Sequence, residues 1–438
     1  MYTFPAMTRR TLPNGLQVLW VPDREQRTMT IALQIPVGEF SDPPSFEGTA
    51  ELTVALMQKG TQALSSEEFA EKLEQTGATI FSETGDEHLV LGCKMLSMHM
   101  ETVAPMFWDM VCSPRFDEGE LTRLKREMIT GLQAEIADPN ALVNKHFFTV
   151  LCTNKHPAGR VHSIASIKRI GLREIRSFYT SYFSPEKSVL AIAGHLVQQE
   201  AEDRWTPVFS GWSASRPKES CIGEPLTPLK RTVIRLVDKP DITQTYFIIG
   251  HPVPGELSPQ RNACALANYI LGGGNFSSRL MERVRSEKGK TYGISSQIMS
   301  NRECGIFMIA TATLCAQTAE VLGAILDVYR EFSTRGITEA ELAKAKEFAI
   351  GNMAFQLEGI GNIVEKLLWL SLFDRPLSYI EHFDSLIASI GVDTVNEAIR
   401  SHLSSAAFTI AAVGPKTQIQ SQLSAMGEVS TVHFRETP

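Results

Sequence analysis

The spacing of apolar and polar positions along the chain predicts a mixture of strands and helices. Residues 28–40 contain a strand-like run, and the apolar segments 188–194 and 408–414 are typical of buried strands. Further strands are expected around residues 79–81 and 89–95. The order of strand, helix, strands and helices predicts an α+β fold with a mostly antiparallel sheet.

One helix in the first half has clear end signals in the sequence. Ser65 and Glu68 have the spacing of a capping box, in which each side chain bonds the backbone N–H of the other residue. Phe69 and Leu73 lie four residues apart, so they share one helical face. Gly77 follows as a natural stop, and a helix over about residues 66–76 is expected.

The chain contains an internal repeat with a period of 220 residues. Gly171 and Gly194 lie in the same apolar context as Gly391 and Gly414 (391 − 171 = 220 and 414 − 194 = 220). Residues 116–121 and 337–342 also begin long helices at equivalent places, with a slip of one residue. A repeat of this length indicates two duplicated domains, because solenoid units are much shorter.

The boundary between the two copies is marked by a change in composition. Residues 205–227 are rich in Gly, Pro and Ser and lack apolar periodicity, which is typical of a linker. We therefore predict an N-terminal domain over residues 1–204 and a C-terminal domain over residues 228–438.

Composition and charge limit the partners of this chain. At 438 residues, with 43% hydrophobic and 21% charged residues, it is an ordinary globular sequence that is too long for one core. Its formal net charge is −7, and no cluster of Lys and Arg forms a surface that could neutralise phosphates. We expect no nucleic acid partner and no membrane partner, and no run of eighteen apolar residues predicts a membrane span.

The cysteines and the first residues of the sequence indicate the compartment. Seven dispersed cysteines without C-x-x-C spacing are typical of free thiols in a reducing compartment. Residues 1–10 lack the charged start and apolar stretch of a signal peptide. We expect a cytoplasmic location, or a periplasmic one if a leader has been removed.

The most informative chemistry lies in residues 48–61. Gly48, Ala50, Gly60 and Thr61 form a frame that resembles the zinc-binding segment of the M16 peptidases, the family of pitrilysin, insulinase and mitochondrial processing peptidase. In that family the frame encloses the inverted motif His-x-x-Glu-His. Two imidazoles on one helical face bind Zn²⁺, and the carboxylate between them activates a water molecule.

The residues at the motif positions of this chain cannot perform that chemistry. Glu51 and Ala55 stand at the two histidine positions, Val54 at the general-base position, and Gly131 where the resemblance places a third, glutamate ligand. Alanine and glycine offer no metal ligand, and valine cannot accept a proton. We expect no metal or other cofactor in this chain and predict that it is not an enzyme on its own.

The second half of the chain resembles the other part of the family's composite active site. Arg285 precedes Tyr292 by seven residues and follows the stretch 272–280, Gly-Gly-Gly-Asn-Phe-Ser-Ser-Arg-Leu. The resemblance covers nearly the whole chain and implies two domains with helices packed on one face of each sheet. It also implies that Tyr292 stabilises an oxyanion and that Arg285 holds a substrate carbonyl, both opposite a zinc ion in another chain.

Two other motifs are too incomplete to predict function. Gly289-Lys290-Thr291 resembles the end of a phosphate-binding loop, but Val284 occupies the position where that loop requires glycine. The nucleophile-elbow motif Gly-x-Ser-x-Gly does not occur in the sequence.

The sequence therefore predicts the non-catalytic subunit of a heteromeric zinc peptidase that acts on peptides. Its partner would be a homologous catalytic chain with the His-x-x-Glu-His motif and the zinc ion, in a heterodimer or a dimer of heterodimers. Two alternatives are a scaffold subunit without a hydrolytic role and an autonomous hydrolase with a relocated site. Closed symmetry also allows an inactive homodimer of the isolated chain.

Overall fold

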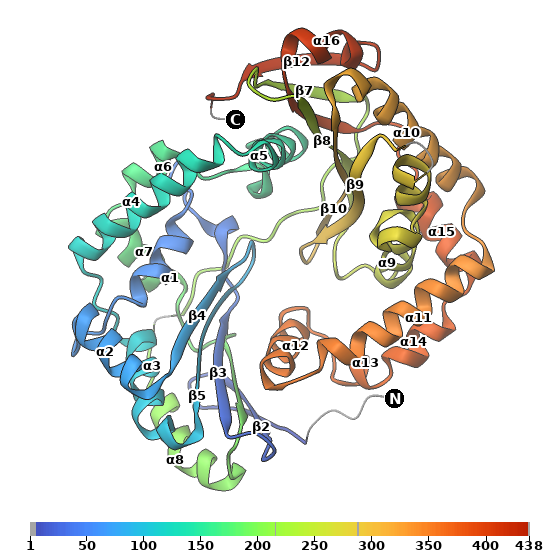
Figure 1. Ribbon diagram of the computed structural model, residues 1–438. Helices are drawn as coiled ribbons and strands as arrows, with labels where there is room; N and C mark the ends of the chain where they lie inside the picture. The colour runs from blue at the N-terminus through green and yellow to red at the C-terminus, as the bar shows by residue number, and fades with distance from the viewer. Residues whose placement is uncertain (1–5, 215, 287–288, 437–438) are drawn as a thin grey trace. The chain divides into compact units, whose positions relative to one another are not determined.

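The computed structural model describes residues 6–214, 216–286 and 289–436, which belong to two compact units (Figure 1). The first unit contains Met1–Thr130, His162–Ile222 and Met353–Phe383, and the second contains Gly131–Val161, Gly223–Asn352 and Asp384–Pro438. Each half of the sequence therefore supplies one segment to the unit formed mainly by the other half. Helices α4 (Glu118–Glu135) and α11 (Glu339–Gln356) each cross from one unit into the other.

The first unit is built on a six-stranded sheet. Its strand order is β1-β2-β6-β3-β5-β4; only β2 and β6 pair in parallel, and the other neighbours are antiparallel. All residues of β6 are buried, so this strand lies between two covering layers. The strands are β1 (Thr8–Thr11), β2 (Gln17–Pro22), β3 (Thr28–Ile35), β4 (Thr79–Thr84), β5 (Leu89–Leu96) and β6 (Val189–Gly194).

The second unit repeats this topology, with strand order β12-β7-β11-β8-β10-β9. Here β7 and β11 pair in parallel as β2 and β6 do, and β8, β10 and β9 follow in antiparallel order. The edge strand differs, because β12 is parallel to β7 whereas β1 is antiparallel to β2. The predicted duplicated α+β fold is confirmed. The strands are β7 (Val233–Asp238), β8 (Gln244–Pro254), β9 (Thr291–Ser300), β10 (Cys304–Leu314), β11 (Thr409–Gly414) and β12 (Glu428–His433).

Helix α5 (Pro139–Cys152), which comes from the first half of the sequence, covers one face of the second sheet. It packs on β7, β8 and β11, and its Phe147 shares a core with Ile248 and Met308. A Cβ atom on Gly250 would lie 2.7 Å from the Phe147 ring, so glycine permits this close approach. Helix α10 (Thr318–Arg335) lies on the other side of the sheet in Figure 1. The sequence pattern did not predict this second covering layer.

Helix α12 (Ile360–Leu372), from the second half of the sequence, has the equivalent role in the first unit. It packs on β3 and β6, and Figure 1 shows α1 (Thr49–Met57), α2 (Ser66–Thr76) and α3 (Met100–Cys112) on the opposite side of the sheet. The remaining α-helices are α6 (Ile164–Arg169), α7 (Leu172–Tyr182), α8 (Gln198–Ser210), α9 (Arg261–Asn268), α13 (Ser378–Glu381), α14 (Phe383–Ser389), α15 (Val392–His402) and α16 (Lys416–Ser424).

The predicted helix ends agree with the structure, whereas the predicted linker starts too early. Ser65 and Glu68 make both bonds of the capping box at the start of α2, and Gly77 ends that helix in the left-handed conformation. Helix α8 extends to Ser210, with Trp205 and Phe209 buried. Residues 205–210 are therefore helical, because their apolar side chains pack on the core, and the irregular connection follows them.

Two buried histidines in the second unit are held in the neutral form. His146 on α5 is fully buried, and burial together with the charges of Arg235 and Lys145 lowers its pKa to about 4. Burial also lowers the pKa of His251 to about 4, although its Nδ1–H donates to the carbonyl of Pro252 over 3.0 Å. Its Nε2 accepts a 2.7 Å hydrogen bond from the Tyr329 hydroxyl.

Because the pKa values of both histidines are lowered in the folded state, we expect acid to destabilise the chain. Below about pH 6.5 the unfolded chain binds protons that the folded histidines accept only near pH 4, so stability present above pH 6.5 is lost as pH falls. We expect each histidine to cost up to about 3 kcal/mol of unfolding free energy at pH 4. Urea unfolding between pH 7 and pH 4 measures the loss, and His146→Leu should make it smaller. Parallel pH profiles for the variant and the wild type would contradict this prediction.

Candidate functional site

Helix α1 carries the degenerate zinc motif, and a buried carboxylate holds its first residues. Asp42 accepts hydrogen bonds from the backbone N–H groups of Gly48 (2.6 Å) and Ala50 (2.8 Å). Burial raises the pKa of Asp42 to about 7, although these two hydrogen bonds lower it. The carboxylate satisfies N–H groups that an α-helix leaves without partners at its N-terminus.

The glycines of the frame have structural roles at the two ends of α1. Gly48 has φ +101°, and a Cβ atom there would lie 2.5 Å from the Ile167 side chain. Gly60 has φ +108°, and its Cβ would lie 2.7 Å from the Leu64 carbonyl oxygen. The buried Thr61 hydroxyl accepts the N–H of Leu64 (3.1 Å). The frame therefore shapes the turns around α1 without contributing any metal ligand.

The structure places three of the degenerate motif positions together on α1. Val54 is buried, Ala55 is half-buried, and the Glu51 side chain is 47% exposed. Gly131 lies on α4 in the second unit, and a Cβ added to it would meet nothing within 4 Å. Of these four residues only Glu51 offers a donor atom, so the set does not fit the zinc ion that the family motif binds.

Glu51 instead belongs to a charged cluster that the sequence analysis did not identify. His162 lies between two carboxylates: its Nδ1 is 3.4 Å from Glu51 Oε2 and its Nε2 is 3.4 Å from Glu39 Oε2. Glu39 lies in the short 3₁₀-helix Glu39–Ser41, and His162 precedes α6. No local spacing in the sequence could reveal this cluster, because its members come from three separate segments.

The surrounding carboxylates favour the protonated form of His162. Burial by itself would lower the pKa of His162, but Glu39, Glu51 and Asp42 together raise it to about 9. Donor atoms of His162, Glu39 and Glu51 lie within 4.8 Å of one another, a separation at which such groups can share a metal ion. In the ion pairs themselves, each carboxylate faces a different ring nitrogen. The arrangement fits an imidazolium that bridges two carboxylates.

In the second unit, Tyr292 lies at an irregular point in strand β9. The register of β9 and β10 shifts between Thr311 and Thr313, so Tyr292 and Gly293 together lie opposite Ala312. Such a bulge redirects the side chains of the strand that carries the extra residue. The Tyr292 side chain is 88% exposed and is available to a ligand. The neighbouring Thr291 hydroxyl donates to the Ala312 carbonyl (2.8 Å) and fixes the start of the strand.

Arg285 lies near the end of the π-helix Met281–Ser286, which precedes β9. Its guanidinium carbon is 4.8 Å from the centre of the Phe276 ring, in cation–π geometry. Arg279 anchors the preceding turn, because it forms a bidentate ion pair with Glu341 (2.7 and 2.8 Å). Arg285 and Tyr292 therefore both lie in the second unit, Arg285 near the end of the π-helix and Tyr292 at the start of β9.

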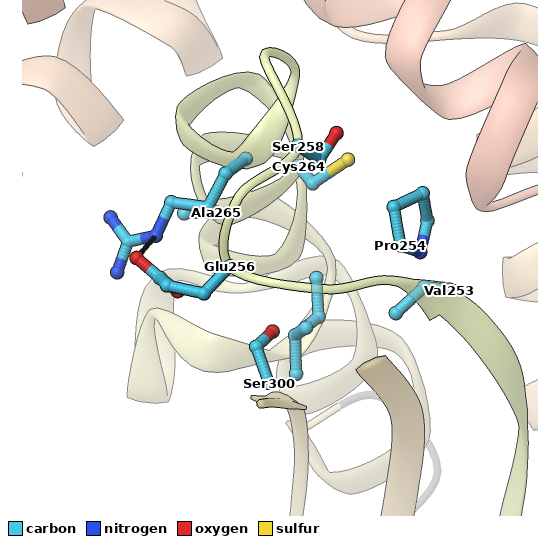
Figure 2. Close-up of a pocket in the computed structure, with 9 residues that line it drawn as sticks. Val253, Pro254, Glu256, Ser258, Cys264, Ala265 and Ser300 are labelled. Carbon is cyan, nitrogen blue, oxygen red and sulfur yellow. Dashed lines mark ion pairs between the residues drawn. The ribbon is translucent and has the colours of Figure 1, made fainter. Parts of the chain in front are cut away.

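A separate cavity of about 220 Å³ lies in the second unit, where β8 ends and α9 begins. The buried Glu256 forms an ion pair with Arg261 over 2.8 Å, and Ser258 and Ser300 also line the cavity (Figure 2). Neither Arg285 nor Tyr292 lines this cavity. Its lining residues are Val253, Pro254, Glu256, Ser258, Arg261, Cys264, Ala265, Ile298 and Ser300.

Two parts of the sequence match models of one protein family. Residues 17–157 match the family model "Insulinase (Peptidase family M16)", and residues 169–348 match the model "Peptidase M16 inactive domain". The chain belongs to peptidase family M16, as the resemblance in the sequence predicts.

Individual relatives of the chain have names of both kinds, peptidase and non-peptidase. An uncharacterized zinc protease of Mycobacterium leprae is 25% identical over 93% of this chain and 91% of its own length. A non-peptidase homolog of Helicobacter pylori is 22% identical over 86% of this chain and 87% of its own length. The crystal structure of a peptidase M16 inactive domain from Pseudomonas fluorescens has a TM-score of 0.86 and 26% identity, and the match covers 94% of this chain and 98% of that one.

In the described part of the chain, no helix is both long and apolar enough to cross a bilayer.

The cluster around His162 predicts how pH affects its contribution to stability. Because its folded pKa is above the unfolded value of about 6.5, the histidine stabilises the fold below pH 6.5 and loses this effect as pH rises towards 9. We expect His162→Gln to lower the unfolding free energy by up to about 3 kcal/mol at pH 6 and by much less at pH 10.

Urea unfolding at the two pH values measures this difference. His195→Gln, which changes an exposed histidine of the same unit, is the matched control. An equal loss at pH 6 and pH 10 would show that the ring acts through packing and not through its charge.

Proposed function

We propose that this chain is the non-catalytic subunit of a heteromeric M16 zinc peptidase and that it completes the active site of a homologous catalytic partner. In this proposal the partner carries His-x-x-Glu-His and the zinc ion, and the substrate is an unfolded or short peptide. The observation that carries the proposal is the exposed Tyr292 at the bulge of β9, with Arg285 seven residues before it in the sequence. The match to the M16 inactive-domain model and the relative named a non-peptidase homolog support it.

The two side chains have the chemistry that such a role needs. Attack of water on a peptide carbonyl places negative charge on its oxygen, and a preorganised hydroxyl donor stabilises that charge. The Tyr292 phenol is such a donor. The Arg285 guanidinium, with five N–H groups in one plane, can hold a neighbouring backbone carbonyl of the substrate. Zinc bound by the partner would polarise the scissile carbonyl and activate the attacking water.

The loss of donor atoms from α1 supports this division of labour. Val54 and Ala55 leave α1 without the general base and the imidazole pair of the family motif, so in this proposal hydrolysis requires a second chain. We place the complex in the cytoplasm, which the seven free thiols support, since disulfides are rare in reducing compartments.

Replacing the Tyr292 hydroxyl tests the proposal most directly. In the complex that co-purifies with this chain from its native cells, Tyr292→Phe should lower kcat about 100-fold or more, because one oxyanion donor is lost. The KM should change little, and size-exclusion chromatography should show an intact complex. Arg285→Ala should mainly raise KM.

A tyrosine away from the proposed site provides the control. Tyr246→Phe on β8 removes a hydroxyl that bonds Gln244 (3.1 Å) and should leave turnover unchanged. Turnover that is unaffected by Tyr292→Phe would favour a scaffold subunit without a hydrolytic role. Activity of the isolated chain that survives a chelator would instead indicate an autonomous hydrolase.

A further inference from the structure

Phe276 is a large apolar residue that the fold leaves exposed beside Arg285. Its side chain is 72% exposed, and it lies in the short 3₁₀-helix Asn275–Ser277 directly after the glycine run. The centre of the ring lies 4.8 Å from the guanidinium carbon of Arg285, in cation–π geometry. Burial therefore contributes little to holding the ring in this place.

The neighbouring backbone fixes the position of Phe276. The N–H of Gly274 donates to the Tyr269 carbonyl (2.8 Å), and the Ser277 hydroxyl donates to the Gly274 carbonyl (2.9 Å). Ser278 and Leu280 are fully buried on the other side. The loop is thus anchored both before and after the ring, and an exposed aromatic side chain can keep a defined position.

The glycine run also brings this loop against the strand that carries Tyr292. A Cβ atom on Gly272 would lie 2.7 Å from the Ser296 backbone nitrogen on β9, so only glycine permits this approach. Ser296 in turn bonds Asn268 through its hydroxyl (2.8 Å). The glycine run therefore fixes the loop of Phe276 against the strand that carries Tyr292.

The Phe276 ring contacts the face of the Arg285 guanidinium and leaves the N–H groups at the edge of the guanidinium available for hydrogen bonds. The five N–H groups of arginine point outward in the guanidinium plane, whereas the cation–π contact uses the face. Stacking thereby restricts a long, flexible side chain without using the donors that would bind a carbonyl. A cation–π contact at an exposed site corresponds to roughly a two- to fivefold change in an equilibrium constant.

We infer that Phe276 positions Arg285 for a substrate carbonyl and that its exposed surface receives an apolar or aromatic side chain of the bound peptide. This inference rests on the proposed function and deepens it, because it names Phe276 as a positioning and specificity residue and apolar peptides as the preferred substrates. An aromatic or aliphatic side chain that covers the ring would remove its apolar surface from water. A peptide with only small or charged side chains would lack this contact.

Two substitutions at position 276 separate the aromatic ring from its apolar volume. Phe276→Leu keeps an apolar side chain but removes the π-system, and Phe276→Trp keeps the π-system. The native complex is assayed with two unstructured fluorogenic peptides, one that contains phenylalanines and one with alanine at each of those positions. We expect Phe276→Leu to raise KM at least threefold for the first peptide, with less effect on the second and unchanged kcat. Phe276→Trp, which keeps an aromatic ring, should have the KM of the wild type.

Phe355→Leu is the matched control, because Phe355 is similarly exposed (70%) and lies outside this loop. Its kinetics should equal those of the wild type, and thermal unfolding should show that all three variants fold.

The outcomes distinguish this inference from the function on which it rests. If Arg285→Ala weakens substrate binding but Phe276→Leu does not, the inference is wrong and the proposed function stands. If Phe276→Trp raises KM as much as Phe276→Leu does, the inference is also wrong, because the effect would then come from lost packing and not from the lost aromatic ring. If Arg285→Ala, Tyr292→Phe and Phe276→Leu all leave the kinetics unchanged, the proposed function fails as well.

Discussion

Both sheets have strands that are buried on two faces, and this constraint determines how the rest of the chain is arranged. Every residue of β6 and of β11 is buried, so each sheet needs a layer of helices on either side. The helices of one sequence half cover one side. The other side is closed by a single helix from the other half: α12 for the first sheet and α5 for the second. Neither half of the sequence therefore contains all the apolar surface that its own sheet requires.

Hydrogen bonds hold α1 in place although it lacks the histidines of the family motif. Asp42 bonds the N–H groups of Gly48 and Ala50, and Gly60 and Thr61 shape the turn that follows the helix. These interactions need no metal ion. The positive charge of the His162 imidazolium balances the negative charge of Glu51. The segment is thus stabilised by hydrogen bonds and an internal cation, so the frame of the motif can exist without its catalytic residues.

The sequence could predict those features that depend on local spacing. The ends of α2, the buried strands β6 and β11 and the duplication all follow from patterns within a few residues or from direct repetition. The resemblance of residues 48–61 and 272–292 also predicted the family correctly. The exchange of α5 and α12 was not predictable in this way, because an amphipathic helix does not encode which sheet it will cover. The charged cluster could not be predicted for the same reason, since Glu39, Glu51 and His162 meet only in the folded chain.

Phe276 and Tyr292 differ from the residues of the two cores in what holds them. Most large side chains of the two cores are buried, and their positions follow from packing. Here Phe276 and Tyr292 are both mostly exposed, and a bulge interrupts β9 at the tyrosine. Exposed aromatic rings contribute little to the core, and a bulge gives up regular pairing of the strand. Stability of the second unit therefore does not require this arrangement, whereas the proposed presentation of a hydroxyl and a guanidinium to a peptide would. That contrast is the physical reason to look for the function of this chain at β9 and its preceding loop and not at α1.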